Sequence, residues 1–277
     1  MFKKIITVCT LLLAIPFLSG CDVIKRDSME NINIYTTNYA TQYITDRLYG
    51  QHSNIYSIYP NGVNINDYTL TKKQIKDYSQ SQLYIFNGLD EKEKKYVNEM
   101  RQKNEKLKII DTSLSMEYTN GIEELWLDPS NLLMMAQNIK KGFAEYINNY
   151  YLNNDVKNNY EQLKIDASNL DARIKKTVQN ADEKEILVSD NLFNFLSKYG
   201  LKVYSLDDDT INGRTTSDII SLIKDGSIEY IIVKNNDGDY YSSETLPTGD
   251  KTLYLRFHVP NISHLHSYLF PHYRKYN

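Results

Sequence analysis

Short apolar segments typical of β-strands alternate with amphipathic segments along most of this chain, and a long helical stretch divides the alternation into two halves. Before that stretch, the predicted strands are 32–35, 54–59, 83–86 and 107–110, and the predicted helices are 39–49, 72–78 and 91–104. After it, the predicted strands are 186–188, 201–205, 228–233 and 253–255, and the predicted helices are 192–199 and 216–224. Strands that alternate with helices favour parallel sheets. The sequence therefore predicts an α/β fold of two lobes with mainly parallel sheets, joined by a long helix.

The joining stretch begins at Asp128-Pro129, where Asp can cap a helix and Pro suits its first position. The apolar residues that follow share one helix face: Leu132, Met135, Ala136, Ile139, Phe143 and Ile147. Asn153-Asn154 interrupts this pattern, and Asp155 can cap a second helix of about 25 residues, roughly 38 Å long, enough to pass from one lobe to the other. The expected organisation is an N-terminal lobe over 32–154, a linking helix over 155–181 and a C-terminal lobe over 182–277.

The first twenty residues combine two lysines, a short apolar run and small residues before Cys21, which is typical of an export signal. The apolar run is shorter than the about 20 residues that span a bilayer. The segment Leu18-Ser19-Gly20-Cys21 resembles the lipobox of bacterial lipoproteins, and this resemblance implies that Cys21 becomes the lipid-modified first residue. We then expect a tether over 22–31 and a lipid-anchored protein on the extracellular face of the cell membrane. The alternative is an ordinary signal peptide that happens to end near a cysteine.

Composition excludes several classes of protein. Without the signal, 30 basic residues face 35 acidic ones, and this mildly acidic balance disfavours nucleic acid as a partner. Cys9 would leave with the signal and Cys21 would carry lipid, so no cysteine remains for a disulfide or a thiolate metal site. The sequence also lacks a nucleophile elbow and a phosphate-binding glycine loop. We therefore expect a binding protein and not an enzyme.

Several segments resemble the metal-binding subunits of bacterial zinc and manganese ABC importers. The matching segments are Pro60-x-Gly62 with Asn66-Asp67-Tyr68 and Thr71, Leu83 to Gly88, Trp126-Leu127-Asp128-Pro129, Val188-Ser189-Asp190 and Lys198 to Leu201. The resemblance implies two α/β lobes that hold a divalent metal ion between them and deliver it to an ABC permease with a cytoplasmic ATPase subunit. Within these segments, Trp126 is predicted to be a core residue and Asp128 a helix cap.

The resemblance also implies a set of metal ligands, which differs here from the family's histidines. The first position holds Asn66, the second Glu124, the third Asp190 (or Ser189 if no gap is allowed), and the fourth falls on 258–261, where His258 is the candidate. Oxygen ligands suit manganese, calcium or magnesium better than zinc, and adding His258 gives a mixed site that manganese or zinc could accept. Without a cation, Glu124 and Asp190 would repel each other, which raises the pKa of one of them.

Other interpretations of these residues remain open. The altered site could have lost its metal, leaving a surface lipoprotein that acts in adhesion or protein contact. Four histidines lie in the last twenty residues, at positions 258, 264, 266 and 272, and a zinc site there is disfavoured against incidental histidines in a divergent tail. His52 is predicted to be polar loop surface, and the charged run 91–95 a solvated helix face.

Overall fold

We describe a computed structural model of the chain. It describes residues 28–60, 63, 65, 67–117, 122–182, 184–188, 191–205, 216–228, 230–235 and 253–258. Within these ranges, side chains are not described at 122–124, 192, 216, 220, 230–235 and 253–258. The predicted signal, Cys21 and most of the tether lie outside the described residues. So do three of the C-terminal histidines: His264, His266 and His272.

The first sheet is parallel throughout, with the strand order β2-β1-β3-β4. Its strands are β1 (Asn33–Thr36), β2 (Asn54–Ser57), β3 (Leu83–Phe86) and β4 (Lys108–Asp111). The helices between them are α2 (Tyr39–Tyr49), α3 (Lys72–Ser79) and α4 (Glu91–Lys103). All four residues of β3 are buried, as expected for a central strand covered on both faces. The predicted bounds of α2 and β3 are confirmed, and those of the other strands and helices of this sheet shift by one or two residues.

Two hydrophobic clusters cover the two faces of this sheet. On one face, Ile34, Leu83 and Ile110 pack with α2 and with the helices that follow the sheet. On the other face, Tyr84 and Phe86 pack with residues of α3 and α4. Side chains that alternate along β3 therefore serve opposite faces, as the period of a strand requires.

Helix α5 (Pro129–Tyr146) begins as predicted, because the Asp128 side chain accepts the N–H of Ser130. Helix α6 (Tyr150–Gln179) has 30 residues, about 45 Å at 1.5 Å per residue. The prediction that it begins after Asp155 was wrong. Asn149 is the N-cap and accepts the N–H groups of Tyr151 and Leu152, and the side chain of Asp155 instead contacts His52.

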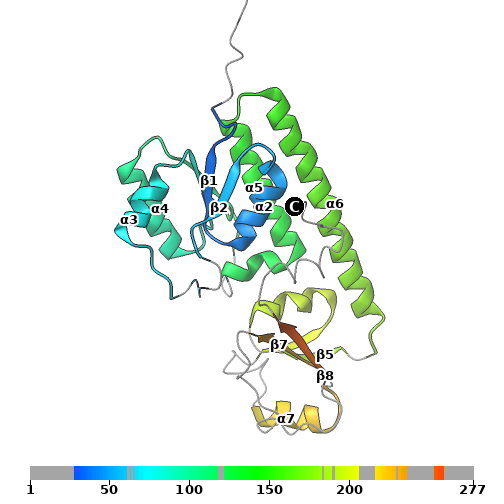
Figure 1. Cartoon of the computed structure of the whole chain (residues 1–277). Helices are drawn as coiled ribbons and strands as arrows, with labels where there is room; N and C mark the ends of the chain where they lie inside the picture. Colours follow the sequence, from blue (N-terminus) through cyan, green and yellow to red (C-terminus); the bar gives the residue numbers. More distant parts are fainter. Residues whose placement is uncertain are drawn as a thin grey trace, which may run out of the picture.

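The second sheet, with the order β6-β5-β7-β8, is also parallel. Its strands are β5 (Glu185–Val188), β6 (Lys202–Ser205), β7 (Tyr230–Asn235) and β8 (Leu253–His258). Helix α7 (Thr216–Lys224) has its predicted bounds, whereas the predicted helix at 192–199 is the 3₁₀ helix η3 (Asn191–Tyr199). Figure 1 shows this sheet beside the far end of α6, below the first lobe. The prediction of two parallel α/β lobes joined by a long helix is confirmed.

Within the described residues, no helix is both long and apolar enough to cross a membrane.

Candidate functional site

The four predicted metal ligands share one topological position, after the carboxyl ends of parallel strands. Asn66 follows β2, Glu124 lies in the 3₁₀ helix η2 (Ile122–Leu127) after β4, Asp190 follows β5, and His258 ends β8. Ligands of open α/β sheets bind outside the carboxyl ends of the strands. Asn66 and Asp190 lie outside the described residues, and the side chains of Glu124 and His258 are not described. The ligand set therefore stays a prediction.

Contacts between η2 and η3 bring the carboxyl ends of the two sheets toward each other. The ammonium group of Lys198, in η3, contacts the carboxylate of Asp128, which caps α5 in the first lobe. It also lies 3.0 Å from the hydroxyl oxygen of Ser130 and 3.4 Å from Oδ1 of Asp171 in α6. The neighbouring Tyr199 hydroxyl donates to Asp171 at 2.7 Å. One lysine thus bridges the second lobe to two helices, a role that no sequence pattern indicated.

The pKa of Tyr199 is changed by burial of its hydroxyl and by nearby acidic side chains. Desolvation is the largest cause, and the hydrogen bond to Asp171 and the nearby Asp128 carboxylate add to it; together they raise the pKa of Tyr199. The phenol therefore stays neutral and remains a hydrogen-bond donor from the second lobe to α6 at physiological pH.

Lys92 of α4 binds the backbone both before and after position 66. The Lys92 ammonium donates to the carbonyl oxygens of Ile65 and Tyr68, the latter at 3.1 Å. The Tyr68 hydroxyl in turn accepts from the Gln74 side chain at 2.8 Å. These bonds fix the backbone one residue before and two residues after Asn66, the predicted first ligand.

Glu93 of α4 corrects the prediction that the charged run 91–95 is a solvated helix face. Its side chain is buried, at 2% exposed, and Oε2 accepts the N–H of Asn87 at 2.8 Å, just past the carboxyl end of β3. Burial raises the pKa of Glu93 to about 8, because desolvation outweighs the bond from Asn87. Desolvation is the main cause of the raised pKa values of Tyr59 and Tyr84, and the nearby Glu93 carboxyl group raises both further. The carboxyl end of the first sheet therefore contains a carboxyl group that is mostly protonated at neutral pH.

The Asn87-Gly88 turn after β3 packs directly against the end of β4. The Gly88 N–H donates to Oδ1 of Asp111 at 2.9 Å, and the same oxygen accepts the N–H of Ser113. A Cβ atom at position 88 would lie 2.0 Å from Oδ2 of Asp111. Any other residue at position 88 would displace the Asp111 carboxylate and disturb the two hydrogen bonds that it accepts, which gives this segment a structural role.

Trp126 and Asp128 have the structural roles predicted for them. Trp126 is nearly buried in the core of the first lobe, and its ring lies 6.1 Å from that of Tyr39. Together with the cap at Asp128, this packing fixes the last turn of η2, where Trp126 lies two residues beyond Glu124.

Among the side chains that the structure describes, no three His, Cys, Asp or Glu residues gather as a metal site. His52, predicted to be loop surface, is partly buried, and its Nε2 lies 3.1 Å from Oδ2 of Asp155. It belongs to the packing of α6 on the first lobe, away from the carboxyl ends of the strands.

Comparison with known proteins finds relatives along most of the chain. A metal ABC transporter substrate-binding lipoprotein of Lactococcus lactis is 28% identical over 217 residues, covering 71% of this chain and 68% of the relative. The manganese ABC transporter substrate-binding lipoprotein PsaA of Streptococcus anginosus is 26% identical over 220 residues, covering 72% and 70%. Among solved structures, the Zn(II)-bound ZnuA-like domain of Streptococcus pneumoniae AdcA has a TM-score of 0.64 at 19% identity, covering 81% of this chain and 87% of that domain.

The family model for ZnuA, described as "Zinc-uptake complex component A periplasmic", matches residues 34–256. The match begins in β1 and ends in β8, so it covers both sheets and the helix between them. By this match, the chain belongs to the ZnuA family.

Proposed function

We propose that this protein is the extracellular, membrane-anchored solute-binding subunit of a metal ABC importer and that it captures a divalent cation of the manganese or zinc type between its two lobes. The observation that carries the proposal is the match to the ZnuA family over both sheets. Relatives named as manganese and metal ABC transporter lipoproteins support this substrate class. The protein would work with a permease and an ATPase subunit, as the binding proteins of ABC importers do.

The proposed site lies between the carboxyl ends of the two sheets. Asn66, Glu124, Asp190 and His258 would supply oxygen atoms and one imidazole nitrogen, a donor set that suits manganese and still accepts zinc. The carboxylates of Glu124 and Asp190 would balance the charge of a divalent cation. Lys92, which holds the backbone on either side of Asn66, and Lys198, which bridges the lobes, would act as positioning residues.

The anchor would be a lipid on Cys21. Leu18-Ser19-Gly20-Cys21 supports this modification, and the curated relatives are named lipoproteins. Tethering would keep the carrier close to its permease after each release of metal.

Metal titration of the purified mature chain tests the function. A ligand that binds only the native state stabilises it by about 2.7 kcal/mol at a hundred times its Kd, so we expect the melting temperature to rise by about 5 °C or more with Mn²⁺ or Zn²⁺. Metal content measured by mass spectrometry should approach one ion per chain.

Glu124→Ala should remove most of that shift, and Glu123→Ala is the matched control because it removes the same charge from the same 3₁₀ helix. A chain that gains no stability from Mn²⁺, Zn²⁺ or Ca²⁺, and in which Glu124→Ala changes nothing, would overturn the proposal. That result would instead favour a metal-free surface lipoprotein of the same fold.

A further inference from the structure

Two adjacent tyrosines begin α6 with their side chains largely in solvent. Tyr150 is 76% exposed and Tyr151 is 77% exposed, more than any other large apolar or aromatic side chain that the structure describes. Their ring centroids lie 5.8 Å apart in an edge-to-face arrangement. The next residue, Leu152, is buried in the core of the first lobe. The two rings therefore add little to the core, although they start the longest helix that the structure describes.

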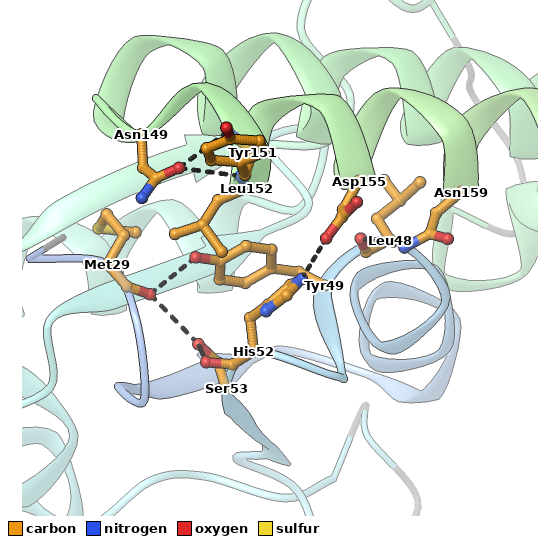
Figure 2. Close-up of polar contacts among 10 residues, drawn as sticks. All are labelled: Met29, Leu48, Tyr49, His52, Ser53, Asn149, Tyr151, Leu152, Asp155 and Asn159. Atoms are coloured by element: carbon orange, nitrogen blue, oxygen red, sulfur yellow. Dashed lines mark hydrogen bonds and ion pairs between the residues drawn. The ribbon is translucent and has the colours of Figure 1, made fainter. Parts of the chain in front are cut away.

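These tyrosines lie at the end of the molecule where the chain enters its fold. Met29 is fully buried, and its carbonyl oxygen accepts the Tyr49 hydroxyl at 2.9 Å. Met29, Tyr49 and Leu152 belong to one hydrophobic cluster. Figure 2 shows Met29 and Tyr49 beneath the first turn of α6, which carries Tyr151 and Leu152. The entry point of the chain and the exposed tyrosines thus share one end of the first lobe.

The length of chain between the proposed anchor and this end limits their separation. Seven peptide units connect Cys21 to Ser28, and a fully extended chain of that length spans about 25 Å at most. Helix α6 then runs from this end toward the second sheet (Figure 1). If Cys21 carries lipid, the start of α6 is held near the membrane, and the second lobe lies at the far end of α6.

We propose that Tyr150 and Tyr151 form a membrane-contact site that rests among the lipid headgroups and orients the anchored protein. The proposal rests on the lipid anchor included in the proposed function. A tyrosine ring has an apolar body and a polar hydroxyl, and such side chains concentrate at membrane interfaces. The lipid on Cys21 supplies retention, and the tyrosine pair determines which end of the body faces the bilayer. The carboxyl ends of the strands in the first sheet then point away from the lipid.

Tryptophan fluorescence in vesicles with brominated phospholipids tests this contact, because bromine quenches only nearby indoles. The lipidated full chain would be reconstituted as the parent protein, as Tyr151→Trp and as Ile165→Trp. Ile165 is a matched control, since it is 53% exposed on the same helix and about 21 Å further along it. The native Trp126, 9% exposed in the core, supplies the same baseline in all three proteins.

We expect the tryptophan at position 151 to be quenched about twofold more than that at position 165, as an interfacial ring should be. Equal quenching at the two positions, in protein that remains with the vesicles on flotation, would overturn the membrane contact and leave the anchor intact. Protein that does not float with the vesicles would overturn both. Metal binding by the same variants reports separately on the proposed function and should not change.

Discussion

The two ends of the first sheet are built from different kinds of interaction. At the amino ends of the strands, Tyr49 covers the incoming chain at Met29, and the ring of Tyr49 lies 4.6 Å from that of Phe143. At the carboxyl ends, the described contacts include acidic side chains and a lysine beside the packing of Trp126. Glu93 is buried under the Asn87 turn, and the Asp128 carboxylate pairs with the ammonium group of Lys198 from the second lobe.

This difference follows from the parallel topology. Because all four strands run in the same direction, every loop that follows a strand lies at one edge, and every loop that precedes a strand lies at the other. The first edge can specialise in ligand binding, and the second is free to close the core and attach the chain. We therefore expect substitutions at the amino ends to change mainly stability, and substitutions at the carboxyl ends to change mainly charge-dependent behaviour.

The largest effect should come from Tyr49→Ala at the amino end. The substitution removes a fully buried ring from its contact with Phe143, which should lower the free energy of unfolding by about 3–5 kcal/mol. Tyr49→Phe is the control: it keeps the ring and loses the hydroxyl that donates to Met29, at a cost of about 1 kcal/mol. Urea unfolding measures both. Equal losses in the two variants would show that the hydroxyl, and not the packing, closes this end.

The second effect concerns pH at the carboxyl end. Folding raises the pKa of Glu93 from 4.5 to about 8, so between these values the folded chain keeps a proton that the unfolded chain has released. Stability from this group is therefore complete below pH 4.5 and falls as the pH rises toward 8. Glu93→Gln stays neutral and should be more stable than the parent by about 2–4 kcal/mol at pH 9, with little difference at pH 4.

Urea unfolding across this pH range measures the slope. Glu91→Gln is the matched control, because Glu91 lies exposed on the same helix and pairs only with exposed Lys94 among the described contacts. If Glu91→Gln and Glu93→Gln change the pH dependence alike, the buried carboxyl is not its source.

Local signals in the sequence predicted much of the fold. Helix α2 has its predicted bounds because Asn38 caps it, and Gly50 follows its last residue. The start of α6 was missed because Asn149 and Asp155 are both suitable caps. In the structure, Asp155 instead contacts His52, which lies 103 positions earlier in the sequence. Local sequence patterns do not reveal contacts between residues so far apart.

The candidate site shows the same limit. Family resemblance named Asn66, Glu124, Asp190 and His258 as metal ligands, and this set stays a prediction. The burial of Glu93 was missed because the sequence of a charged run does not reveal which of its side chains points into the protein, here under the Asn87 turn. The bridge made by Lys198 requires two lobes in contact, and composition does not encode that contact.

The third prediction concerns that bridge. Lys198→Met should break the ion pairs with Asp128 and Asp171, which are partly exposed, at a cost of about 1 kcal/mol or less. Since the bridge joins two lobes, its loss should widen the distribution of distances between them. Spin labels at Asn98→Cys and Lys224→Cys measure this, because the predicted mature chain has no cysteine besides Cys21.

Lys202→Met is the control for this experiment, because Lys202 pairs with Glu185 inside the second lobe. It should leave the distance distribution unchanged. A parent-like distribution in Lys198→Met would mean that packing alone sets the position of the lobes.

The smallest effect should come from Asp155→Asn at the amino end. If Asp155 capped a helix, Asn would replace it at almost no cost, since both are good N-caps. As the partner of His52, Asp155 instead loses a charge-assisted contact, and the free energy of unfolding should fall by about 0.5 kcal/mol, less at high salt. The same substitution in a His52→Asn background should then cost nothing further, because the two residues act as one pair. Additive losses in that double-mutant cycle would separate the two side chains and leave Tyr49 as the main contact that closes the amino end.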